Sequence, residues 1–165
     1  PIEQVWYTGR MHGEIIGKNV CSEGGLFSYK PGPWFNSAKF FDIEYQTYGQ
    51  VPPAEINESN VGHVYWEHRS GMKALHICFD KANSVFLGLN AFGIRYRHDL
   101  LDKWLQEKKP VSYVIENLQA ANFDPEFFKT HEAELIGELN RQYPELKIKL
   151  KQKKGLSAFM NLMKS

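Results

Sequence analysis

Short turns between strand-like segments constrain the fold of this chain more than any other feature of its sequence. Three runs rich in aromatic and β-branched residues, at 61–69, 73–79 and 84–92, are connected by short turns at residues 70–71 and 80–83. Connections of this length permit antiparallel hairpins, whereas a parallel crossover needs about a dozen residues or more. The sequence therefore predicts an antiparallel meander.

A further strand is predicted before the meander, at residues 40–48 (FFDIEYQTY). Its side chains alternate as in a half-buried strand, with Phe41, Ile43, Tyr45 and Thr47 on one face and Asp42, Glu44 and Gln46 on the other. We therefore expect a sheet of about four to five strands.

The pattern becomes helical after Gly93. Leu100, Leu101, Trp104 and Leu105 are spaced for one helical face, and a second helix is predicted at 113–121. A third should run over 124–143, because Asp124-Pro125-Glu126 combines a capping residue, a proline and an acidic residue at a helix start. Strands followed by helices predict an α+β domain in which C-terminal helices pack against the antiparallel sheet.

A proline and glycine linker at residues 31–33 separates this domain from an N-terminal segment. Residues 2–20 have loosely helical spacing, with Gly9, Gly13 and Gly17 at every fourth position, where another backbone could approach closely. We divide the chain into residues 1–30, a domain at 31–145, and a basic and then apolar tail at 146–165.

The composition excludes several classes of function. The 165 residues carry a formal net charge of +1, too balanced for general nucleic-acid binding or for coating a membrane. Cys21 and Cys78 lie too far apart in the sequence to form a local redox pair or zinc knuckle, and a reduced, cytoplasmic setting is expected. No apolar run approaches the about 20 residues that span a bilayer. We expect neither nucleic acid nor membrane as a partner.

A metal site is the first alternative that the histidines raise. His63 and Glu67 could share a strand face, with His76 on the next strand. Because no second closely spaced pair of ligands accompanies them, we expect no metal. No nucleophile elbow or phosphate-binding glycine loop is present in the sequence either, so we expect no catalytic residues.

Aromatic residues gather directly after the linker. Trp34 and Phe35, with Phe40 and Phe41 beyond them, could present a rigid apolar surface to a planar cofactor or to a neighbouring domain. The alternative is that they are ordinary core.

Three segments resemble the C-terminal part of pyridine nucleotide-disulfide oxidoreductases, most closely the branches of apoptosis-inducing factor and the ferredoxin reductases. They are IEQVWYTGRMHGEIIGKNV, WFNSAKFFDIEYQTYG and LGLNAFGIRYRHDLLDKWL, in that order. The resemblance covers about residues 2–145. It implies that the first segment closes a flavin domain and that the remainder is the interface, or dimerisation, domain.

The resemblance also implies the site and its cofactor. Glu3, Gln4 and Val5 correspond to a helix start that approaches the flavin. Phe35 matches the aromatic residue beside it by motif order, and Trp34, one position earlier, is the alternative. FAD is expected in the full-length parent, with none bound to this segment alone, since the FAD and NAD(P) domains are its missing partners. A homodimer is expected. The alternative is an independent protein-interaction or ligand-binding module.

Overall fold

The computed structural model describes residues 5–53, 60–123 and 131–149. The chain divides into two compact units, Pro1–Gly32 and Pro33–Ser165. The first unit contains α1 (Trp6–Cys21), where the sequence predicts a helix. Its three glycines have open surroundings, because a Cβ placed on Gly9, Gly13 or Gly17 would meet no atom within 4 Å.

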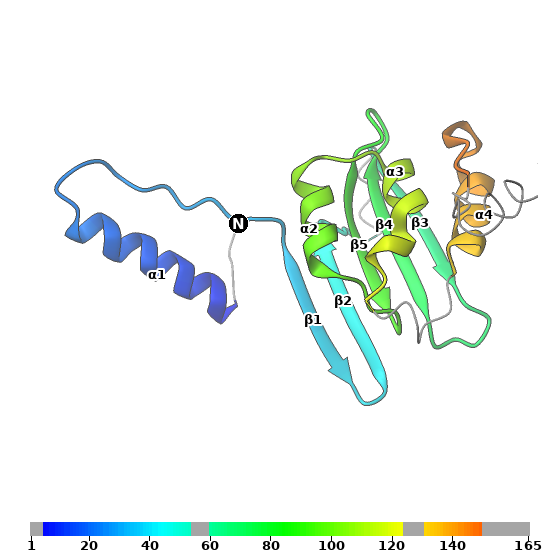
Figure 1. Cartoon of the computed structure of the whole chain (residues 1–165), viewed down its shortest axis with the longest axis horizontal. Coiled ribbons are helices and arrows are strands. Elements are labelled where there is room, and N and C mark those ends of the chain that lie inside the picture. The colour runs from blue at the N-terminus through cyan, green and yellow to red at the C-terminus, as the bar shows by residue number, and fades with distance from the viewer. Residues whose placement is uncertain (1–4, 54–59, 124–130, 150–165) are drawn as a thin grey trace, which may run out of the picture. The chain divides into compact units, whose positions relative to one another are not determined.

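The second unit is built on a five-stranded antiparallel sheet, as its short turns predict (Figure 1). The strands are β1 (Phe35–Phe40), β2 (Ile43–Gly49), β3 (Val61–Glu67), β4 (Ala74–Asp80) and β5 (Phe86–Phe92). Their order in the sheet is β1-β2-β5-β4-β3. The last three strands form the predicted meander, while the β1–β2 hairpin joins it beside β5 and not beside β3.

The segment at 40–48 differs from the single strand predicted there. Phe40 pairs with Ile43, so the chain reverses at Phe41 and Asp42, and Phe41 lies in a turn with a φ of 52°. Within β2, Gln46 and Tyr48 are buried and face the helices. The Gln46 side chain is satisfied there, because it accepts a hydrogen bond from the Tyr96 N–H at 2.8 Å and donates one to the Tyr96 carbonyl at 3.3 Å. A paired glutamine can therefore occupy a core position that its polarity would forbid if it were unpaired.

Helices cover the sheet face that carries Gln46 and Tyr48 (Figure 1). They are α2 (His98–Gln106), α3 (Val111–Asn117), the 3₁₀ turn η1 (Leu118–Ala121) and α4 (Glu132–Gln142), which is followed by η2 (Pro144–Leu146). The helix α2 contacts β2 and β5, and α4 contacts β3. The core lies between the two layers, with strand residues Val64, Trp66, Leu75, Ile77, Phe79 and Leu89 against helix residues Leu101, Trp104, Val114, Ile115, Leu135 and Leu139.

The predicted helices are found where the structure describes the chain. The helix predicted over 124–143 is shorter than expected: its predicted start at Asp124-Pro125-Glu126 lies outside the described residues, and α4 begins only at Glu132, because His131 is its non-helical N-cap. The helix ends at Gln142, close to the stop expected at Pro144. The first residues of the tail predicted from residue 146 are attached to α4. The Asn140 side chain accepts a hydrogen bond from the Ile148 N–H and donates one to the Ile148 carbonyl, each at 2.9 Å. Among the described residues, no helix is both long enough and apolar enough to cross a membrane.

Candidate functional site

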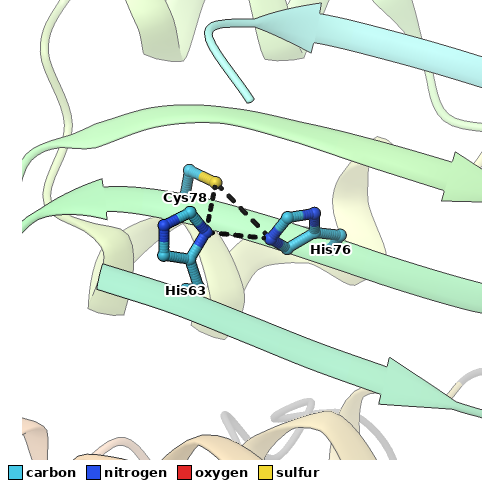
Figure 2. Close-up of side chains that lie close together, drawn as sticks. All are labelled: His63, His76 and Cys78. Atoms are coloured by element: carbon cyan, nitrogen blue, oxygen red, sulfur yellow. Dashed lines mark hydrogen bonds between the residues drawn. The ribbon is translucent and has the colours of Figure 1, made fainter. Parts of the chain in front are cut away.

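The sheet face opposite the helices carries a cluster of three side chains that can bind metal. His76 and Cys78 alternate along β4, and His63 lies directly opposite Cys78 on the neighbouring strand β3. Because side chains alternate between faces along a strand, and paired residues share a face, all three project from the same side of the sheet. Figure 2 shows their ring nitrogens and sulfur pointing toward one another.

The two ring nitrogens and the sulfur lie close enough together to bind one metal ion. His63 Nδ1 is 3.1 Å from His76 Nε2 and 3.4 Å from Cys78 Sγ, and the third separation, from Cys78 Sγ to His76 Nε2, is 3.7 Å. The thiol is completely buried, while both imidazoles are half-buried. Burial raises the pKa of Cys78 to about 12, and burial together with the neighbouring His63 lowers the pKa of His76. Both shifts favour neutral groups when no cation is near.

The structure changes the set of residues that the sequence brought together. Glu67 is not part of the cluster, since its carboxylate accepts a hydrogen bond from the Tyr65 hydroxyl at 3.0 Å. Cys78 takes the third place. The missing signal was the close pair His76 and Cys78, because two residues apart on a strand is the spacing that puts two ligands on one face. The expectation of no metal is based on the absence of such a pair, and the chain does contain one.

A second group, His68, His131 and Glu134, also lies within metal-binding distance. Its surroundings suit a cation less. Lys73 Nζ lies 3.2 Å from His131 Nε2, and His68 Nδ1 is 2.8 Å from the Ser70 hydroxyl. The positive charge of the Lys73 ammonium beside His131 would repel a metal cation bound to this group.

The two aromatics after the linker have different environments. The Phe35 ring is partly buried against the core, 4.8 Å from the Tyr48 ring and 4.1 Å from the His98 ring. Trp34 remains 39% exposed. The backbone of Trp34 is held nonetheless, since its carbonyl accepts a hydrogen bond from the Gly49 N–H at 2.7 Å. Of the two, Trp34 offers more surface to an outside partner.

The start of α1 is described only from Val5, and Glu3 and Gln4 lie outside the described residues. Val5 is the N-cap, and its carbonyl accepts a hydrogen bond from the Thr8 hydroxyl at 2.8 Å. Among the described residues, the first turn of α1 has no acidic residue and no side chain caps it. Within residues 5–21, no carboxylate in the first turn therefore compensates the positive dipole end of this helix.

Comparison with known proteins identifies the fold. The chain matches no protein-family model, and a search of curated proteins finds no match. Among solved structures, it is similar to an NAD-dependent persulfide reductase from A. fulgidus, with a TM-score of 0.59 and 18% sequence identity. The similarity covers 88% of this chain but only 29% of that one. Most of this chain therefore shares its fold with a segment that makes up less than a third of that reductase.

Proposed function

We propose that this chain is the C-terminal part of a pyridine nucleotide-disulfide oxidoreductase, that it forms the interface domain beside the flavin, and that it does not catalyse a reaction alone. The observation that carries this proposal is the match of 88% of the chain to 29% of an NAD-dependent reductase. The order of the three resembling sequence segments supports it independently. FAD and NAD(P) would be bound mainly by the remaining part of such an enzyme.

The contribution to the flavin site comes from two places in this proposal. The start of α1 at Val5, with Glu3 and Gln4 before it in the sequence, would approach the flavin ring and stabilise negative charge on its reduced form. An aromatic residue after the linker would form one wall. Trp34 suits this role better than Phe35, because the Phe35 ring already stacks within the core.

The same proposal includes a homodimer contact at the β1–β2 hairpin. Phe41 is 98% exposed in the turn, and its neighbour Phe40 is also exposed. A positive φ is costly for a bulky residue, and a two-residue hairpin turn normally prefers Asn, Asp or Gly there. An exposed phenylalanine held in such a conformation is explained if its ring is buried by a second copy.

The experiment compares the chain with the product of the complete reading frame that contains it. The isolated chain should bind FAD weakly or not at all when titrated, because the contacts to the pyrophosphate and adenine lie elsewhere and one wall contributes little affinity. The full-length product should retain FAD through gel filtration. Sub-micromolar FAD binding by the isolated chain would show that the domain boundary is wrong.

The sequence of the complete reading frame distinguishes this proposal from the alternative of an independent binding module. An oxidoreductase of the proposed family requires a glycine-rich dinucleotide fingerprint that follows a strand upstream of this segment. A frame without it would favour an independent binding module, whose sheet face opposite the helices would receive the partner.

A further inference from the structure

The cluster of His63, His76 and Cys78 has the dimensions of a tetrahedral zinc site. A zinc ion with bonds of about 2.0 Å to nitrogen and about 2.3 Å to sulfur holds two nitrogens about 3.3 Å apart and a nitrogen and a sulfur about 3.5 Å apart. The cluster has 3.1 Å between its nitrogens and 3.4 and 3.7 Å between nitrogen and sulfur. The side chains are therefore already placed around one common point.

Hydrogen bonding alone explains this arrangement less well. A ring nitrogen of neutral histidine carries either a proton or a lone pair, so it cannot donate and accept at once. His63 Nδ1 faces both His76 Nε2 and Cys78 Sγ, and a single proton or lone pair there must be shared between the two contacts. A cation at the centre accepts a lone pair from all three atoms together.

The cluster is also held in place by the fold. The Tyr143 hydroxyl accepts a hydrogen bond from the His63 N–H and donates one to the His63 carbonyl, each at 3.2 Å. The Tyr143 ring in turn contacts Phe79 of the core. Beside Cys78 on β5 stands Gly88, which adds no side chain to this face. A ligand set fixed by its support needs little reorganisation when it binds an ion.

We propose that His63 Nδ1, His76 Nε2 and Cys78 Sγ bind one Zn²⁺ ion, with the fourth position open to water or an external ligand. Two imidazoles and a thiolate suit zinc, whereas Mg²⁺ and Ca²⁺ require oxygen ligands. Three protein ligands with one open position are typical of zinc that contacts an exchangeable molecule. On binding, the Zn–S bond replaces the S–H bond of Cys78, and the proton passes to the solvent.

The test uses the full chain with Co²⁺ as a spectroscopic substitute for Zn²⁺. Co²⁺ titration should give about one bound ion per chain, visible bands of tetrahedral intensity and a thiolate-to-cobalt charge-transfer band. Added Zn²⁺ should displace the cobalt and abolish these bands. Cys78→Ala should remove the charge-transfer band. It should also weaken cobalt binding by more than about 100-fold, since the loss of a supporting hydrogen bond alone weakens metal binding about 10- to 100-fold.

Two matched variants control for the residue types. Cys21→Ala removes the exposed cysteine of the first unit, and His131→Gln disrupts the second histidine group; both should bind cobalt as the unchanged chain does. Far-UV circular dichroism checks that each variant is folded. If Cys78→Ala does not fold, His76→Gln removes one imidazole ligand with milder damage to packing; it should weaken cobalt binding, while the charge-transfer band of any cobalt still bound remains. A folded chain that binds no cobalt, or a charge-transfer band that depends on Cys21 or His131, would overturn the proposal.

Discussion

Replacing Phe35 should destabilise the domain more than replacing its neighbour Trp34. The Phe35 ring packs against the core beside Tyr48 and His98, whereas Trp34 is 39% exposed. Truncating a fully buried phenylalanine to alanine costs about 3–5 kcal/mol, and an aromatic pair adds about 0.5–1.5 kcal/mol. For the partly buried Phe35 we expect Phe35→Ala to lose about 2–3 kcal/mol, and Trp34→Ala about 1 kcal/mol.

The assay is urea unfolding of the chain at constant temperature, followed by far-UV circular dichroism because removal of Trp34 alters the fluorescence. The unfolding midpoint should fall while the slope stays constant. Phe35→Leu is the control: it keeps apolar volume but loses the stacking, and should cost about 1 kcal/mol. If Trp34→Ala costs as much as Phe35→Ala or more, Trp34 is the core residue and Phe35 is the one available to a cofactor.

Three further predictions concern the hairpin, a buried tyrosine and a close backbone contact. Phe41→Asn should change the free energy of unfolding by about 0.5 kcal/mol or less, since asparagine tolerates a positive φ. It should weaken self-association about tenfold or more in sedimentation, because Phe41 is exposed in the chain alone. An unchanged dimer would exclude the hairpin from the interface. Burial raises the pKa of Tyr48, so the stability that the neutral hydroxyl contributes is complete below the ordinary tyrosine pKa and is lost as the pH rises above it. The urea midpoint of the unchanged chain should therefore fall above about pH 10, and the midpoint of Tyr48→Phe should fall less. Identical pH profiles of the two proteins would refute this. Gly88→Ala should lower the free energy of unfolding by several kcal/mol in the same assay, because the added Cβ would collide with the backbone of Tyr48 and Gln50. A stability within about 0.5 kcal/mol of the unchanged chain would show that β2 can move away.

The fold was predictable where short turns left few alternatives. The turns after β3 and β4 forced antiparallel pairing, so the meander follows from the sequence. The strand β1 was missed because its burial does not alternate clearly, and its only large apolar residues stand at its two ends. Its absence led us to read Phe41 as part of a strand, although Phe41 forms the turn. The position of the hairpin beside β5 depends on long-range packing, which local patterns do not encode.

The candidate metal site was only half visible in the sequence. His63 and His76 could be proposed as ligands from their strands alone. The third ligand depends on strand register, because the pairing of His63 with Cys78 brings the thiol next to both imidazoles. Glu67 had an equally plausible spacing but bonds to Tyr65 instead. A one-residue shift of β3 would have reversed which side chains share the face.

The most direct measurement of the proposed function is anaerobic reduction of the full-length protein by NADH and NADPH, followed by flavin absorbance. Our account predicts a yellow protein with bound FAD whose absorbance bleaches when a nicotinamide nucleotide is added. Trp34→Ala in that protein should alter the flavin spectrum or loosen FAD, and Phe35→Ala should mainly lower stability. A colourless, folded full-length protein that binds no FAD and oxidises neither nucleotide would contradict the account.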